Sequence, residues 1–158
     1  MNMVYIYGLM ALLGGIGLSV QAAINSNLSF GIGAQPLVAA LISFFVGTVC
    51  LGIIAYFQAD WNSVQSNLTQ QSIWKYIGGM IGAAFVFTSI FLAPKIGITN
   101  TMFLFILGQL FSGMLIDHFG LINMLVRAVH WWKLLGMGIM LSGLVIFMFG
   151  ERFFSSNS

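Results

Sequence analysis

The chain has 158 residues, of which 59% are hydrophobic and 5% charged, and its formal net charge is +2 at pH 7. A water-soluble domain of this length carries about 25% charged residues, because its surface has to be hydrated. The composition therefore excludes a soluble globular protein, and the few scattered basic residues offer nucleic acid no patch to bind. We expect an all-α integral membrane protein whose main partner is the lipid bilayer.

The sequence lacks the common motifs for catalysis and for metal or nucleotide binding. It contains no CxxC, HExxH or GxxxxGK[ST] pattern, and its single cysteine, Cys50, lies inside an apolar run. No pair of nucleophile and base can be assembled from these residues. We therefore expect no catalytic residue, no metal site and no cofactor, and we do not expect an enzyme.

A membrane-spanning helix needs about 20 apolar residues to cross a hydrocarbon core of about 30 Å. Several stretches of the chain meet this requirement, and we expect the polar segments 25–35 and 58–72 between them to be loops. Pro36 suits the first turn of the second helix. We predict one transmembrane domain over residues 1–158, with five spans over residues 4–24, 36–57, 73–93, 97–117 and 133–149.

Five spans place the two termini on opposite sides of the membrane, and the lysines and arginines of short loops decide which side is cytoplasmic. Lys75, Arg127 and Lys133 fall on the N-terminal side, whereas Lys95 and Arg152 fall on the other side. This small difference leaves two hypotheses open. Either loop details set one fixed topology, or copies insert both ways and pair as an antiparallel homodimer of ten helices. The second hypothesis would build from two chains the inverted repeat that many transporters carry within one chain.

Two amides lie near the end of the first predicted span. Gln21 and Asn25 are four residues apart and therefore share one helical face, which Gly14 and Gly17 extend toward the N-terminus. A polar group at membrane depth is costly unless it is paired, so both amides are candidates for lining a cavity. The alternative is that they bond a neighbouring helix or cap the span.

The fourth predicted span carries a polar stripe. Thr101, Phe105, Gln109, Ser112 and Ile116 recur at steps of three and four residues, with Gln109 near the middle of the span. Such a stripe is expected to face the bundle interior or a water-filled cavity. We therefore predict that its first four members bind substrate. The alternative is an interhelical hydrogen bond, which contributes about 0.6 to 2 kcal/mol in membranes.

Asp117 is the one carboxylate attached to a predicted span, and it lies at the span's end beside His118. It is a candidate site for coupling transport to a proton or a cation. The alternative is a helix-end residue that fixes a loop. No acidic residue lies in the middle of any span, although a buried carboxylate is the simplest device for exchanging protons against cationic substrates.

Small residues recur at intervals of four in the third and fifth predicted spans. Gly78 with Gly82, and Gly138 with Ser142, form small-xxx-small pairs that allow helix backbones to approach closely. We predict that these pairs serve helix packing. The pattern does not say whether the packing partner belongs to the same chain.

Two stretches of the sequence resemble a known family: QAAINSNL at residues 21–28, preceded by glycines, and GQLFSGMLIDHFGL at residues 108–121. With the chain length and the five spans, they are similar to the YdcZ-type branch of the drug/metabolite transporter superfamily over nearly the whole chain. The resemblance implies a half-size transporter of the bacterial inner membrane that works as a pair of five-helix units, often in opposite orientations. The related small multidrug exporters use a central glutamate in the first span. This sequence has none, which argues against proton-coupled export of cations.

We expect a secondary transporter, an exporter of a small uncharged or zwitterionic molecule, that works by alternating access as a dual-topology homodimer. Gln21, Asn25, Gln109 and Ser112 would line its cleft, because amides and hydroxyls bind polar groups without neutralising a charge. The alternative is a non-transporting membrane interaction or assembly subunit, in which the same amides join helices.

Overall fold

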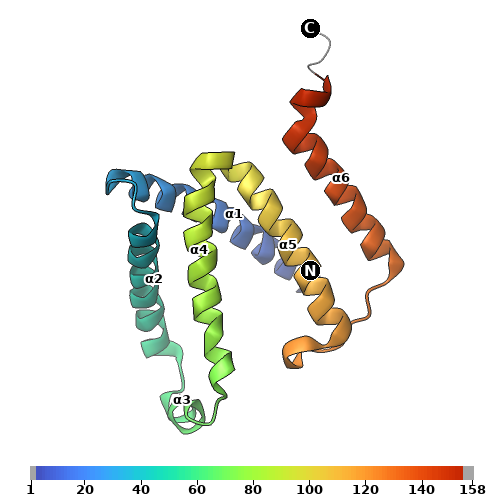
Figure 1. Cartoon of the computed structure of the whole chain (residues 1–158). Helices are drawn as coiled ribbons and strands as arrows, with labels where there is room; N and C mark the ends of the chain where they lie inside the picture. Colours follow the sequence, from blue (N-terminus) through green and yellow to red (C-terminus); the bar gives the residue numbers. More distant parts are fainter. Residues whose placement is uncertain (1–2, 155–158) are drawn as a thin grey trace. The chain divides into compact units, whose positions relative to one another are not determined.

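The computed structural model describes the backbone of residues 3–154 and the side chains of residues 3–150. Within this part of the chain every regular element is a helix: α1 (Met3–Gly31), α2 (Pro36–Gln58), α3 (Trp61–Leu68), η1 (Ile73–Tyr76), α4 (Ile77–Ile96), α5 (Ile98–Phe119), η2 (Leu121–Asn123) and α6 (Trp131–Phe154) (Figure 1). Five helical segments are long and apolar enough to cross a membrane: Met3–Gly31, Pro36–Gln58, Ile73–Ile96, Ile98–Phe119 and Trp131–Gly150. The prediction of an all-α protein with five membrane helices is confirmed.

The chain divides into two compact units, Met1–Ile98 and Thr99–Ser158. In the first unit α1, α2 and α4 pack against one another. Its core consists of Ala39, Ala40, Val86 and Ile90. Two consecutive alanines on α2 leave room for α4 to approach closely, as small residues do in membrane helix pairs. The second unit holds α5, η2 and α6. The prediction of a single domain over residues 1–158 stays a prediction.

Helix α1 continues past residue 24, where we predicted its end, and reaches Gly31. The polar residues that suggested a loop are buried instead: Asn25, Ser26 and Ser29 are 5%, 8% and 6% exposed. In this position α1 contacts α2 and α4. Burial of the polar face between helices favours helical backbone, because that backbone satisfies its own N–H and C=O groups. The prediction from local composition therefore made this helix too short.

The hydrophilic segment 58–72, which we expected to be a loop, contains the short helix α3. Asp60 caps this helix: its carboxylate accepts hydrogen bonds from the backbone N–H of Asn62 at 3.1 Å and of Ser63 at 3.3 Å. The Ser63 hydroxyl donates to the same carboxylate at 2.6 Å. The Tyr76 hydroxyl donates to the carbonyl of Leu68 at 3.0 Å and fastens the end of α3 to η1. A charged cap at the first turn is a strong local signal for a helix.

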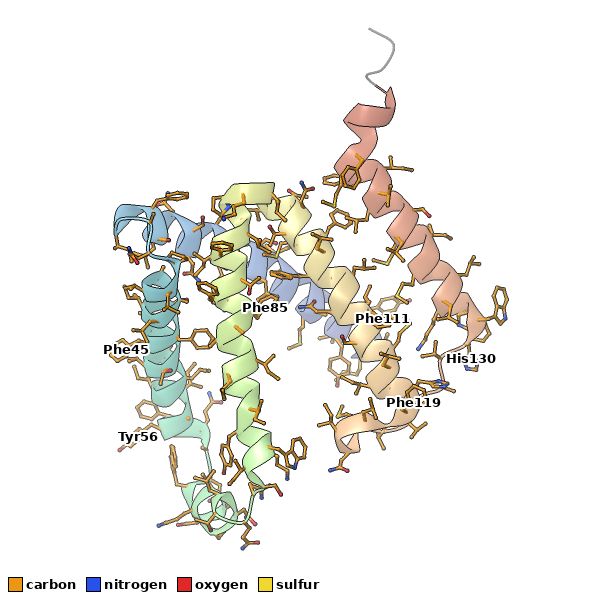
Figure 2. The ribbon with its side chains drawn as sticks, viewed as in Figure 1. Phe45, Tyr56, Phe85, Phe111, Phe119 and His130 are labelled. Carbon is orange, nitrogen blue, oxygen red and sulfur yellow. The ribbon has the colours of Figure 1, made fainter. Side chains whose placement is uncertain are left out.

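Most apolar side chains of the spans are exposed on the outside of the protein. Only 0% to 22% of the most apolar window of each span is buried. Phe45 and Tyr56, for example, project outward from α2 and are 69% and 71% exposed (Figure 2). In a bilayer such side chains contact lipid or another copy of the protein, because water would not tolerate them.

The first prediction concerns the pH dependence of α3. The Ser63 hydroxyl, followed by the Ser63 backbone N–H, holds the pKa of Asp60 below its usual value. A lowered pKa in the folded state stabilises α3 above the unfolded value of about 3.9, and this stabilisation is lost as the pH falls through the folded pKa. We expect the hydrogen-exchange protection factors of residues 61–68 to be constant near neutral pH and to fall below about pH 4.

The matched control is Asp60→Asn, because asparagine caps a helix but does not titrate in this range. Its protection factors are expected to be independent of pH. Equal acid sensitivity in the two proteins would show that another group controls α3.

Candidate functional site: a groove between α5 and α6

The connector of residues 120–130 brings the end of α5 and the start of α6 together. Gly120 ends α5 with φ +59°, and a Cβ atom at this position would lie 2.7 Å from Cγ2 of Val126. The contact, together with the left-handed backbone angle, therefore favours glycine at this position. The Arg127 N–H donates to the Asp117 carbonyl at 2.7 Å, and the Val129 N–H donates to Nδ1 of His118 at 3.1 Å. These bonds fold the connector back along the last turn of α5, where helix carbonyls lack internal partners.

A groove of ≈ 640 Å³ lies between the two helices that the connector joins. Further along, α5 and α6 approach through large side chains: the rings of Phe103 and Phe147 have centroids 5.1 Å apart. Residues from both helices line the groove, namely Gln109, Leu110, Gly113, Met114, Asp117, Lys133, Gly136, Met137 and Met140. This volume lies within the range of small-molecule sites, which is about 300 to 1,000 Å³.

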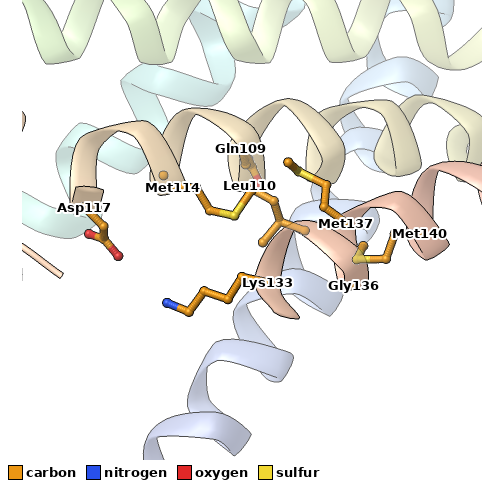
Figure 3. Close-up of a pocket in the computed structure, with 9 residues that line it drawn as sticks. Gln109, Leu110, Met114, Asp117, Lys133, Gly136, Met137 and Met140 are labelled. Atoms are coloured by element: carbon orange, nitrogen blue, oxygen red, sulfur yellow. The ribbon is translucent and has the colours of Figure 1, made fainter. Parts of the chain in front are cut away.

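The groove is charged at one end and apolar along its walls. Figure 3 shows the Asp117 carboxylate and the Lys133 ammonium at the same end, with Met137 and Met140 farther along the groove. No ion pair joins these two charged groups among the side chains that the structure describes. Gln109 adds an amide, which can both donate and accept hydrogen bonds. The site can therefore bind a positive group, a negative group and an apolar body at once.

Two of the predicted site residues, Gln109 and Asp117, are brought together in this groove. The other members of the predicted stripe lie outside its lining. Ser112 is exposed, Phe105 is half-buried, and Thr101 is only 1% exposed. The proposed binding roles of these three residues stay predictions.

The two amides of α1 belong to the first unit of the chain and differ from each other in environment. The Asn25 amide nitrogen donates to the Ser43 hydroxyl of α2 at 3.1 Å, and Asn25 is 5% exposed. This contact is an interhelical hydrogen bond, the alternative that we left open for this residue. Gln21 is exposed on α1, and its role in binding stays a prediction.

The small residues predicted to serve helix packing face mostly open space. A Cβ atom added at Gly78 or at Gly138 would meet nothing within 4 Å, whereas one at Gly82 would lie 3.8 Å from the Phe44 ring. The Ser142 hydroxyl donates to the carbonyl of Gly138 at 3.0 Å, within α6 itself. Gly82 thus packs against α2, and the packing role of the other three residues stays a prediction.

Sequence reasoning missed Lys133 and the methionines of the groove. Lys133 was expected only to influence topology, because its distance from Asp117 in the sequence gives no sign that the two residues line one groove. Met114, Met137 and Met140 carry no pattern that separates them from ordinary apolar residues. The one signal in the sequence was that Asp117 lies at the end of the fourth predicted span and Lys133 at the start of the fifth.

Among the described residues, no three histidine, cysteine or acidic side chains lie close enough to hold a metal ion.

Five apolar helices and an open groove with charged groups at one end define a multi-pass helical membrane protein. Residues 6–146 match the model of the family described as "Putative inner membrane exporter, YdcZ", and the chain belongs to this family. It is 29% identical over 105 residues to the inner membrane protein YdcZ of Escherichia coli strain K12, an alignment that covers 66% of this chain and 70% of the relative. No solved structure matches the chain significantly. The protein is therefore a multi-pass protein of the bacterial inner membrane, as predicted.

The second prediction tests the connector that forms the groove. Gly120→Ala places a side chain at a positive φ and against Val126, so we expect it to destabilise the protein by about 1 to 3 kcal/mol. Thermal unfolding of detergent-purified protein measures this change.

Gly108→Ala in α5 is the control, because a Cβ atom there meets nothing within 4 Å. It is expected to be neutral or to stabilise the helix by up to about 1 kcal/mol. Similar stabilities of the two variants would contradict the role that we assign to Gly120.

Proposed function

We propose that the protein is a secondary transporter that exports small zwitterionic molecules with an apolar body, and that the groove between α5 and α6 is its binding site. The observation that carries this proposal is the presence of one carboxylate and one ammonium, Asp117 and Lys133, at the same end of an otherwise apolar groove. Membership of a family described as an inner membrane exporter supports transport as the activity.

The charges of the groove argue for a zwitterion. A ligand ammonium would pair with the Asp117 carboxylate and a ligand carboxylate with the Lys133 ammonium, so no charge would stay unpaired. A purely cationic or anionic ligand would leave one protein charge desolvated without a partner, which costs free energy. The Gln109 amide would bind the polar end without adding charge. The flexible methionine side chains would adapt to the apolar part of the ligand.

Transport also requires that the groove open to each side of the membrane in turn. We propose that two copies in opposite orientations form an antiparallel homodimer for this purpose, since inverted pairs are a common architecture of alternating-access transporters. Two features of the chain support this arrangement: the near balance of lysines and arginines on its two sides, and the large apolar surface that one copy leaves uncovered.

The third prediction tests the binding site with a matched series of ligands. Leucine carries both charges, leucine methyl ester only the positive one, and N-acetyl-leucine only the negative one. We expect the purified protein to bind leucine, or another amphipathic zwitterion of a screened panel, more tightly than either singly charged form. Asp117→Asn and Lys133→Met are each expected to weaken zwitterion binding about tenfold, the usual effect of losing a charge-assisted hydrogen bond.

Exchange of the two charges in the double variant Asp117→Lys with Lys133→Asp should restore part of the affinity, since the same pair of charges would again face the ligand. Gln109→Leu should fold normally and bind more weakly. Lys75→Gln is the control, because Lys75 bonds Gln71 outside the groove. Absence of saturable binding, and of flux in proteoliposomes, for the whole panel would refute this proposal. That result would favour the non-transporting assembly subunit.

The fourth prediction tests the antiparallel homodimer through topology. Two lysines added after Arg152 are expected to favour the orientation with the C-terminus in the cytoplasm, because positively charged flanks stay inside. Reporter proteins fused to the C-terminus should reveal both orientations in the parent and mainly one orientation in the edited chain. A parent with a single orientation that the added lysines leave unchanged would exclude dual topology.

A further inference from the structure

A second cavity, independent of the α5–α6 groove, lies in the first unit of the chain. Its volume is ≈ 220 Å³, and residues near the ends of α1, α2 and α4 form its walls. The polar part of the wall comprises Ser26 and Ser29 of α1 and Lys95 of α4, and Phe91 and Pro36 lie beside them. None of these residues lines the α5–α6 groove.

The two serines are buried but do not use their hydroxyl groups within the protein. Ser26 and Ser29 are 8% and 6% exposed, and neither side chain has a hydrogen-bond partner among the described residues. Other helical hydroxyls of the chain do bond their own helix: that of Ser89 donates to the Val86 carbonyl at 2.8 Å. No described side-chain oxygen or nitrogen is sealed in the interior without a partner. The two unpaired hydroxyls therefore open into the cavity.

The N-terminus of α2 reaches the same cavity through Pro36. Gln35 stands at the cap position but makes no side-chain cap, and the first turn contains no acidic residue. The N–H groups at the start of a helix lack internal partners and carry a partial positive charge, which favours a bound anion. Pro36 itself has no N–H to donate, so the contribution of α2 is the positive end of its dipole beside the space into which the two hydroxyls open.

Lys95 adds a full positive charge at the cavity. Its ammonium lies 3.8 Å from the centroid of the Phe91 ring, and both residues line the cavity. Asp60 is the one acidic residue in the sequence of this unit, and its carboxylate is engaged by Asn62 and Ser63 at the cap of α3. No carboxylate of this unit therefore neutralises Lys95.

We infer that this cavity binds an oxyanion group, a phosphate, through the Lys95 ammonium and the hydroxyls of Ser26 and Ser29, with the positive end of the α2 dipole beside them. All these donors suit an acceptor with several oxygens, and their summed charge is positive. The donors sit at the ends of membrane-spanning helices, the depth at which lipid head groups lie. The oxyanion is supplied either by the phosphate of an anionic lipid or by a soluble ion.

Binding measurements on the full-length protein in a neutral detergent distinguish the two sources. The probes are inorganic phosphate, dioleoyl-phosphatidylglycerol, and dioleoylglycerol, which has the same acyl chains but no phosphate. Thermal stability and native mass spectrometry report binding, since a ligand of the folded state raises the melting temperature. Stabilisation by phosphatidylglycerol alone identifies a lipid site, and stabilisation by inorganic phosphate as well identifies a site for the free ion. The inference is overturned if neither probe stabilises the protein more than dioleoylglycerol does.

Substitutions of the cavity residues test whether the probe binds in this cavity. Lys95→Gln is expected to weaken binding of the stabilising probe about tenfold, and the double variant Ser26→Ala with Ser29→Ala to weaken it several-fold. Without ligand the serine double variant should be at least as stable as the parent, because it removes buried hydroxyls that have no partner. Lys75→Gln, the same change outside the cavity, should bind like the parent. Undiminished binding by both cavity variants would place the anion elsewhere and overturn the inference.

Discussion

The hydrocarbon interior of the membrane offers no hydrogen bonds, and this constraint shapes the whole chain. Each backbone N–H and C=O group in that layer has to be paired within the protein, which leaves helices as the only structure for a chain of this composition. The five apolar helices follow directly from it. Interrupting a helix or placing a charged side chain in the same layer costs free energy. Connecting segments and charged residues are therefore found where the membrane-spanning helices end. Asp117 and Lys133 lie at such ends, and so does Lys95. The charged groups of both candidate sites accordingly come from the ends of helices.

Polar side chains in the spans fall into two groups according to how they are paired. Some are satisfied inside the chain: Asn25 bonds Ser43 of the neighbouring helix, and Ser142 bonds a carbonyl of its own helix. The Asn25 bond joins α1 to α2, whereas the Ser142 bond lies within α6. Others, including Ser26 and Ser29, are buried beside empty space with their hydrogen-bonding capacity unused. Because an unpaired polar group at this depth costs free energy, the second group is where binding of a ligand brings the largest gain.

The spans could be predicted from the sequence because the requirement of the hydrocarbon layer acts on each segment separately. The helix ends could not, because they depend on what packs against them. Residues 25–31 read as a polar loop, yet they are helical where α2 and α4 bury Asn25, Ser26 and Ser29. The candidate site shows the same division. Gln109 and Asp117 stood out as polar groups on an apolar helix, whereas the role of Lys133 depends on the path of residues 120–130. No periodicity in the sequence encodes that path.

The methionines that line the α5–α6 groove have a consequence for how selectivity can be distributed along it. A thioether side chain has several rotatable bonds and a polarisable sulfur, so its contact surface adjusts to the shape that it meets. The charged end, by contrast, holds two groups of opposite sign at fixed places on the backbone. For the ligands that we propose, discrimination would concentrate at the charged head, and the tail would be recognised only by its lack of polarity. A surface of this kind tolerates chemical variety among its ligands, as flexible methionine-rich surfaces do in promiscuous binding proteins. Replacement of single methionines by branched or aromatic residues would narrow that range without altering the charged end, which offers evolution a simple route from a generalist to a specialist.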